Sequence, residues 1–175
     1  EGYFCAGLDL KAFAEDPAPA WKAHFQEDWA TFHNNVFNCA KPIVGALEGF
    51  AIAGGSALAF ACDYLVVGKK SFLHVAEVER GLQAPINLAW LSIRHSYALA
   101  LKMAVLGQRH YGDELVALGI ANSCVDDADV VAEARTLAQR LAGFNPTSVQ
   151  GLKQALLNVK APTDFLKVVQ KIKAG

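Results

Sequence analysis

The stretch Gly49-Phe50-Ala51-Ile52-Ala53-Gly54-Gly55-Ser56-Ala57-Leu58 has a glycine pair at the point where an apolar strand gives way to a buried helix. A helix that begins on bare backbone directs free N–H groups, and the positive end of its dipole, toward whatever lies before it. The stretch therefore predicts an anion-binding turn. A second turn of the same character, Phe4-Cys5-Ala6-Gly7-Leu8-Asp9-Leu10, lies upstream. One backbone N–H group from each turn could hold the same oxygen atom.

The segments around the glycine pair predict the fold class. Residues 43–47 and 64–68 are short apolar runs typical of buried strands, and the helix that begins at the glycine pair lies between them. Strand, helix and strand in this order indicate a βαβ crossover in a largely parallel sheet. The predicted class is α/β.

Helices are predicted over most of the remaining chain. After a loop signal at 16–19, residues 21–38 carry aromatic side chains at mostly helical spacing, and Lys41-Pro42 ends that helix. Further helices are predicted at 96–106, 113–118, 130–141, 147–159 and 163–173. The last helix has an apolar face that would pack either on a neighbouring subunit or on the chain's own core.

Composition excludes several classes of protein. A chain of 175 residues with 53% hydrophobic residues and a net charge of −1 describes a compact domain without a basic field for nucleic acid or an anionic membrane. No apolar run reaches the roughly 18 residues of a membrane span, and no signal peptide opens the chain. The four cysteines are scattered without a paired motif, so we expect them reduced and the protein cytoplasmic. The five histidines show no metal-ligand spacing, so no metal is expected.

Five segments together resemble the crotonase superfamily, the enoyl-CoA hydratase and isomerase group. They are the turn at 4–10, the stretch at 41–55, Ala61-Cys62-Asp63-Tyr64, Leu106-Gly107-Gln108-Arg109 and Ala117-Leu118-Gly119-Ile120-Ala121-Asn122. The resemblance implies a partial crotonase-like ββα spiral core at 1–107, with both turns, and a C-terminal helical oligomerisation region at 108–175. Family members carry further strands and a helix before the first turn, so this chain is expected to begin inside the domain.

The resemblance also assigns roles to site residues. The backbone N–H groups of Ala6 and Gly54 would form an oxyanion hole for a thioester carbonyl, with Ala53, Gly55 and Ala57 against the substrate. The substrate would be an acyl-CoA thioester, with coenzyme A as part of it and no separate cofactor. The family's assembly would be a homotrimer or a dimer of trimers. An alternative for Gly54 and Gly55 is that they only allow the helix to approach the sheet closely.

The acid and base differ from those of the family's hydratases, which use two glutamates. The first glutamate falls on Ala57, whose methyl group can neither orient water nor transfer a proton. The second falls on Glu77, which could act as a lone acid/base. Glu79 takes that role if the register differs by one or two residues, and the non-catalytic alternative for Glu77 is a surface ion pair with Arg80.

The loop that follows also differs from the family, since Leu82-Gln83-Ala84-Pro85-Ile86-Asn87-Leu88 stands where a Pro-Gly stretch is usual. The acyl pocket is therefore expected to have a different shape. Ser56, His74 and Asn87 are polar groups near the expected pocket, and we interpret them as structural: Ser56 in a first helical turn, His74 at a strand end and Asn87 as a helix N-cap.

Three functions are compatible with these residues. The leading hypothesis is an acyl-CoA enzyme that stabilises a thioester enolate, with Glu77 as its only acid/base, in isomerisation or a related lyase or hydrolase reaction. The second is enoyl-CoA hydration with a substitute group that binds water. The third is a non-catalytic paralogue that binds acyl-CoA.

Overall fold

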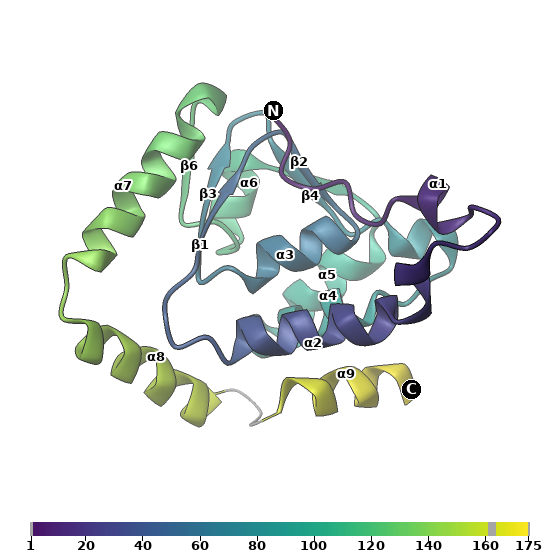
Figure 1. The fold of residues 1–175 in the computed structure, drawn as a ribbon. Helices are drawn as coiled ribbons and strands as arrows, with labels where there is room; N and C mark the ends of the chain where they lie inside the picture. The colour runs from purple at the N-terminus through teal and green to yellow at the C-terminus, as the bar shows by residue number, and fades with distance from the viewer. Residues whose placement is uncertain (1, 161–163, 175) are drawn as a thin grey trace.

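A computed structural model describes residues 2–160 and 164–174, and these residues form two small sheets surrounded by helices (Figure 1). The first sheet contains β1 (Val44–Leu47), β3 (Tyr64–Gly68) and β6 (Ser123–Val125), all parallel, in the order β1-β3-β6. Helix α3 (Gly54–Ala61) lies between β1 and β3 along the chain. The predicted α/β class and the two predicted strands are confirmed.

The second sheet was not predicted as a sheet, although the strand end expected at His74 is confirmed. It contains β2 (Phe50–Ile52), β4 (Phe72–His74) and β5 (Arg109–Tyr111), with β2 parallel and β5 antiparallel to β4. Along the chain, β1 and β3 join the first sheet while β2 and β4 join the second, so the backbone steps between the sheets as it advances. Strands of three residues are too short to show a hydrophobic period, which is why the pattern predicted neither β5 nor the pairing of the three strands.

Residues after Gly107 contribute to both sheets. Strand β5 pairs with β4 and strand β6 pairs with β3, and the short helix α6 (Gly112–Ala117) lies between them. A division of the chain at 107/108 stays a prediction, and the strands on its C-terminal side are part of the two sheets.

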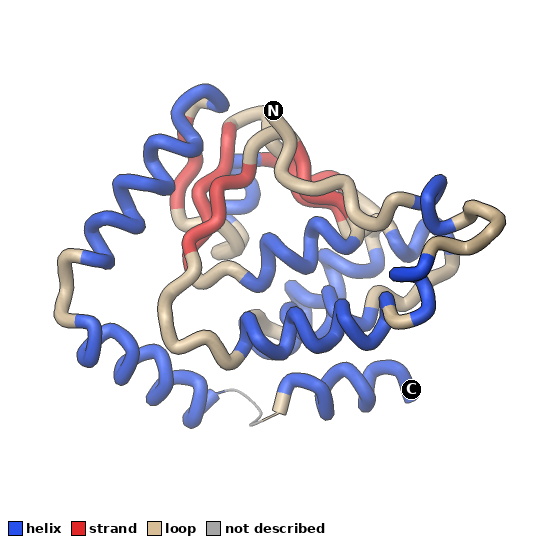
Figure 2. The backbone as a smooth tube through the Cα atoms, viewed as in Figure 1, coloured by secondary structure: helices blue, strands red, loops and turns tan. Residues whose placement is uncertain are grey.

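Helices cover both sides of the strands (Figure 2). The helices not yet given are α1 (Leu10–Phe13), η1 (Ala20–Ala23), α2 (Phe25–Phe37), η2 (Glu77–Arg80), α4 (Pro85–Arg94), α5 (Tyr97–Val105), η3 (Asp127–Asp129), α7 (Val130–Ala142), α8 (Pro146–Lys160) and α9 (Phe165–Ala174). The helix predicted at 21–38 is divided at His24 into the short 3-10 turn η1 and α2. Ser96 and Asn145 accept backbone N–H groups at the starts of α5 and α8, as N-caps do.

The last helix packs on the chain's own core, which decides between the two alternatives left open by its apolar face. Helix α9 contacts α2 and α4, and it lies beside α2 in Figure 1. Phe165 is fully buried, with its ring centroid 4.8 Å from that of Trp90. The predicted start of this helix at residue 163 lies outside the described residues.

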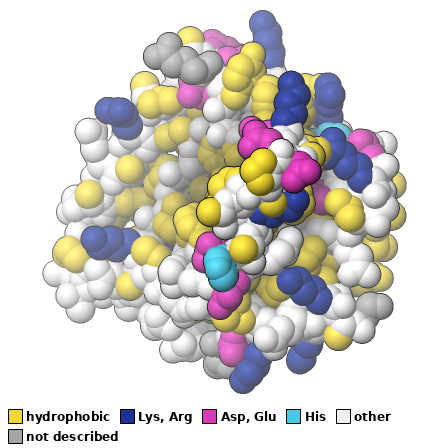
Figure 3. Space-filling model, turned by 45° about the vertical axis from the view of Figure 1, so that its right-hand side comes forward, with side chains coloured by type: hydrophobic (Ala, Val, Ile, Leu, Met, Phe, Trp, Pro, Cys, Tyr) yellow, Lys and Arg dark blue, Asp and Glu magenta, His cyan; other side chains and the backbone are white. Residues whose placement is uncertain are grey.

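Charged and hydrophobic side chains are interspersed on the face shown in Figure 3. Within residues 2–160 and 164–174, no helix is long and apolar enough to span a membrane. All four cysteines are free thiols.

Candidate functional site

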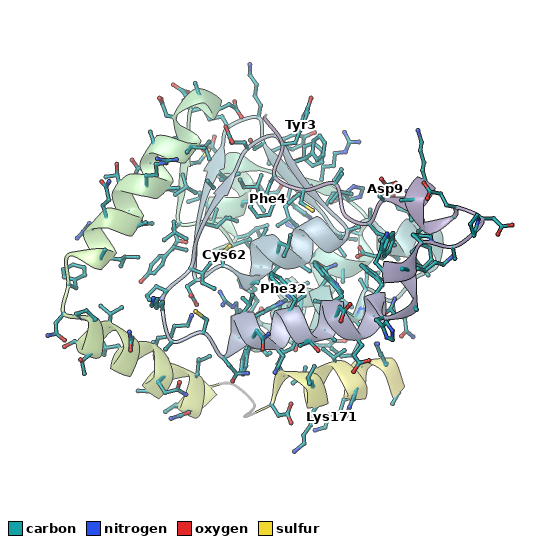
Figure 4. The ribbon with its side chains drawn as sticks, in the orientation of Figure 1. Tyr3, Phe4, Asp9, Phe32, Cys62 and Lys171 are labelled. Carbon is teal, nitrogen blue, oxygen red and sulfur yellow. The ribbon has the colours of Figure 1, made fainter. Side chains whose placement is uncertain are left out.

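The N-terminal segment runs beside β2 and brings the two predicted turns together. The N–H of Phe4 donates to the carbonyl of Glu48 at 2.9 Å, and the N–H of Cys5 donates to that of Phe50 at 3.0 Å. Ile52 returns a bond from its N–H to the carbonyl of Cys5 at 3.0 Å. The labelled Tyr3 and Phe4 mark the course of this segment in Figure 4.

Glycines allow the two turns to touch through their backbones. A β-carbon on Gly55 would collide with the carbonyl oxygen of Cys5. Gly7 has φ +86°, and a β-carbon there would lie 2.9 Å from the carbonyl oxygen of Ile52 and 3.3 Å from the nitrogen of Gly54. Gly7 therefore supplies a left-handed backbone and leaves space in front of the Gly54 N–H.

The N–H groups of Ala6 and Gly54 lie at the junction of these turns. Within the described residues, neither donates to a backbone carbonyl, since Gly54 is the first residue of α3 and Ala6 lies outside the regular elements. Ala6 is exposed, and Trp29 of α2 is the side chain nearest to Gly54, with Cζ2 3.5 Å from the position of a β-carbon there. Two neighbouring N–H donors at an accessible junction can bind an oxygen that carries negative charge.

Ala53 joins β2 to α3 in a backbone conformation that is unusual for alanine, with φ 52° and ψ −116°. Its N–H donates to the carbonyl of His74 at 2.9 Å, and its own carbonyl accepts the N–H groups of Ser56 at 2.9 Å and Ala57 at 3.3 Å. A positive φ at a residue with a β-carbon stores strain, which is typical of functional turns. Nothing in the local sequence indicated this strain.

Glu77 lies at the start of η2, and its carboxylate faces Asn87. The Nδ2 of Asn87 donates to Oε1 of Glu77 at 2.9 Å and to the carbonyl of Ala53 at 3.2 Å. The other oxygen of Glu77, Oε2, is buried without a hydrogen-bond partner in the described part of the chain. Burial raises the pKa of Glu77, against weaker lowering by its own backbone, by Asn87 and by nearby positive charge.

The alternative of an ion pair between Glu77 and Arg80 is not found in the described residues.

Asn87 departs from its predicted role as an N-cap. Pro85 begins α4 and Ala84, in a left-handed conformation, precedes it, so Asn87 lies inside the helix with only 2% of its surface exposed. The sequence signal was an asparagine within the apolar run of an amphipathic helix.

The other polar residues near the turns have structural contacts. The hydroxyl of Ser56 donates to the carbonyls of Ala51 at 3.0 Å and His74 at 2.8 Å, which agrees with its structural interpretation. Nε2 of His74 lies 3.2 Å from Oε1 of Glu79, whose side chain is 54% exposed. The carboxylate of Glu79 therefore contacts His74, whereas that of Glu77 contacts Asn87. Ala57 is fully buried in α3 and brings no polar group to the site.

A cavity of about 740 Å³ lies away from these turns, among the C-terminal ends of α3 and α4 and the helices α7 and α8. Its charged side chains bind one another, since Asp63 pairs with Arg94 at 3.1 Å and with Lys153 at 2.7 Å. None of the residues predicted for the site lines this cavity, so we place the candidate site at the two turns.

Comparisons with known proteins show which sequences and folds this chain resembles. A family model described as enoyl-CoA hydratase/isomerase matches residues 1–173. Carnitinyl-CoA dehydratase of Escherichia coli K12 is 33% identical over 156 residues, which cover 88% of this chain and 59% of that enzyme. The corresponding enzyme of Proteus mirabilis is 32% identical over 155 residues, with the same coverage. The chain thus spans about three fifths of the length of these relatives.

Solved structures show the same fold. An enoyl-CoA hydratase from Polaromonas sp. JS666 has a TM-score of 0.81 at 24% identity, covering 99% of this chain and 68% of that one. An enoyl-CoA isomerase from Mtb has a TM-score of 0.82 at 23% identity, covering 99% and 76%. From the family model, the relatives and the fold together, the chain belongs to the enoyl-CoA hydratase/isomerase family of the crotonase superfamily.

Proposed function

We propose that the protein binds an acyl-CoA thioester and stabilises its enolate between the N–H groups of Ala6 and Gly54, with Glu77 moving the proton. The observation that supports this best is the link from Glu77 through Asn87 to Ala53, which joins the carboxylate to the peptide that carries the Gly54 N–H. The side chain of Asn87 thereby binds both the proposed base and the peptide group of the proposed oxyanion donor.

The oxyanion donors would act on the thioester carbonyl. Removal of a proton from the carbon next to a thioester puts negative charge on its oxygen, and preorganised N–H donors stabilise that charge better than water does. Loss of one such donor in other enzymes costs about 3–4 kcal/mol of transition-state stabilisation. The close backbone contact of Gly55 with Cys5 supports a fixed spacing of the two donors.

Glu77 would serve as the base and then as the acid. Its burial raises its pKa, which brings the carboxyl closer to the range in which one group can both accept and return a proton near neutral pH. Returned to another carbon, the proton completes an isomerisation. Delivered to a leaving oxygen, it completes an elimination of the lyase type.

The single carboxylate favours these reactions over hydration by two glutamates, because Ala57 stands where the first of the family's two glutamates would be. The names of the dehydratase relatives favour a lyase as the second candidate, with a group other than Glu77 holding the water or hydroxyl. The chain covers 59% of the length of those relatives, so we propose their type of reaction for this chain only as the second candidate.

The test is exchange of the protons next to the thioester in deuterated water, measured on a saturated acyl-CoA and a 3-enoyl-CoA. Wild-type protein is expected to exchange these protons, and Glu77→Gln is expected to abolish exchange while it still binds the thioester. Glu79→Gln is the matched control and keeps exchange. Tight binding without exchange in the wild type would instead indicate a non-catalytic acyl-CoA-binding protein.

The proposal also includes the cofactor, the oligomeric assembly and the cellular compartment of the protein. Coenzyme A arrives as part of the substrate, and no further cofactor is required by the proton transfer. Assembly as a homotrimer or a dimer of trimers follows from the family resemblance, and the four cysteines without a paired motif favour the cytoplasm. Light scattering of the purified protein tests the assembly.

A further inference from the structure

Asn87 reaches both parts of the candidate site with one nitrogen atom. Its Nδ2 lies 2.9 Å from Oε1 of Glu77 and 3.2 Å from the carbonyl oxygen of Ala53. Both neighbours are acceptors, so the amide nitrogen must face them, and its two N–H groups can serve one acceptor each. We propose that Asn87 is a positioning residue that aligns the base with the oxyanion donor, a role that rests on the function proposed above.

The contact with Ala53 acts on the oxyanion donor because the carbonyl of Ala53 and the N–H of Gly54 belong to one peptide group. That group is planar and rigid, so a bond that holds the oxygen of Ala53 also sets the direction of the Gly54 N–H. The backbone of α3 already donates to this oxygen from Ser56 and Ala57, and Asn87 adds a donor from α4. Because linked hydrogen bonds polarise one another, the added bond strengthens the Gly54 N–H as a donor.

The contact with Glu77 acts on the base. Oε2 of Glu77 has no hydrogen-bond partner among residues 2–160 and 164–174, so the bond at Oε1 is the side-chain contact that orients the carboxylate. This bond favours the ionised carboxylate and opposes the rise in pKa that burial causes. Asn87 thus keeps a buried carboxylate available as a base.

The position of Asn87 is one where an apolar residue fits the core better. The side chain is 2% exposed, and its Oδ1 is buried with no partner in the described residues. A buried acceptor without a partner lowers stability. A function of the amide nitrogen in the reaction explains why an asparagine stands here despite this loss of stability.

The test compares the pH dependence of proton exchange in the wild type and in Asn87→Leu, which keeps the shape of the side chain and removes both donors. The exchange kcat is expected to fall about ten- to hundredfold, the usual effect of losing a hydrogen bond to a charged group, with a smaller change in KM. The rising limb of the pH profile is expected to move to higher pH, because Glu77 loses a bond that favours its ionised form.

Asn122→Leu is the matched control. Oδ1 of Asn122 accepts the backbone N–H of Leu65 at 2.7 Å in the first sheet, so its loss is expected to lower stability and leave the pH limb unchanged. If Asn87→Leu fails to fold, Asn87→Ala gives the same measurement with less crowding, and the same shift of the pH limb is expected.

The outcomes separate the two proposals. If the wild type does not exchange protons, or if Glu77→Gln exchanges as fast as the wild type, the proposed function and the role of Asn87 are both wrong. If Glu77→Gln abolishes exchange while the Asn87 variants keep the wild-type kcat and pH limb, only the role of Asn87 is overturned.

Discussion

Gly55 and Cys5 touch through their backbones, so that a β-carbon on Gly55 would fall 2.9 Å from the carbonyl carbon of Cys5. This contact joins two turns that lie about fifty residues apart in the sequence. The preceding residue, Gly54, has more room around it. A β-carbon there would lie 3.5 Å from Trp29 and 3.8 Å from Gly7, which are ordinary contact distances. Two adjacent glycines therefore have different structural requirements.

The first prediction follows from this difference. Gly55→Ala forces the turns apart and is expected to lower the free energy of unfolding by about 3 kcal/mol, at the upper end of the usual cost of overpacking. Gly54→Ala is expected to remain within about 1 kcal/mol of the wild type, because alanine suits a helical position and its β-carbon would make only ordinary contacts. Urea unfolding followed by circular dichroism measures both. Equal stability of the two variants would contradict the close contact.

The second prediction concerns Glu77 and pH. Its pKa is raised by burial above the ordinary value of 4.5, so the folded state holds the proton more tightly than the unfolded state. The stabilising contribution of the protonated group is complete below pH 4.5 and is lost as pH rises through the raised pKa. Glu77→Gln is therefore expected to melt at a higher temperature than the wild type at pH 7, with a smaller difference at pH 4.

Thermal unfolding at both pH values checks this prediction, and Glu79→Gln is the control, since that side chain is 54% exposed. A Glu77→Gln variant that melts below the wild type at pH 7 would mean that the carboxylate stabilises the fold, contrary to its buried setting.

The third prediction concerns His33, which is fully buried and accepts a hydrogen bond on Nδ1 from the indole of Trp90 at 2.9 Å. Burial lowers the pKa of His33 from 6.5 to about 4, so the unfolded state binds the proton more tightly. Stability from the neutral ring is present above pH 6.5 and is lost as pH falls toward 4, by up to about 3 kcal/mol from the linkage relation.

The measurement is the free energy of unfolding in urea between pH 7 and pH 5. The slope with pH is expected to be smaller in His33→Gln than in the wild type, while the exposed His24 replaced by Gln leaves the slope unchanged. Parallel slopes in all three proteins would show that His33 does not titrate in this range.

The fourth prediction concerns Asp63, which ties three segments together. Its carboxylate accepts the N–H of Ile43 at 2.8 Å and pairs with Arg94 and Lys153, whose side chains are 23% and 12% exposed. Asp63→Ala leaves two largely buried cations without their anion and is expected to lower stability by about 2–3 kcal/mol, below the usual cost in a fully buried pair. Arg94→Met in the same background is expected to recover part of the loss.

Asp126→Ala is the control for this pair. Asp126 and Lys69 lie 2.8 Å apart with exposed side chains, so water screens their attraction and removal of the pair is expected to change stability little. Chemical denaturation of the variants compares them directly. A similar loss for Asp63→Ala and Asp126→Ala would contradict the burial of the Asp63 cluster.

Several parts of the molecule could be predicted from local patterns. The helices predicted at 96–106 and 147–159 are confirmed as α5 and α8, whose first backbone N–H groups are bound by the nearby side chains of Ser96 and Asn145. The strands at 43–47 and 64–68 were correct because they are apolar runs between clear stop signals. The break of the long aromatic helix at His24 was missed, because the aromatic side chains keep a nearly helical spacing across the short 3-10 turn.

Asn87 was given the wrong role for a related reason. Asn87 lies two residues after Pro85, close to where a helix was expected to begin, and the sequence does not show that the backbone already turns at Ala84. The role of its amide depends on partners ten and thirty-four residues away along the chain.

The sequence by itself determined the family and the two glycine turns, because a missing β-carbon limits what a position can do and is visible without any neighbour. The tertiary structure decided how the site is connected. It brought Cys5 against Gly55, set Ala53 at a positive φ, and placed the Asn87 amide between Glu77 and Ala53. These relations join segments that meet only after the second sheet and α4 have packed, so their geometry depends on the folded core rather than on any local pattern.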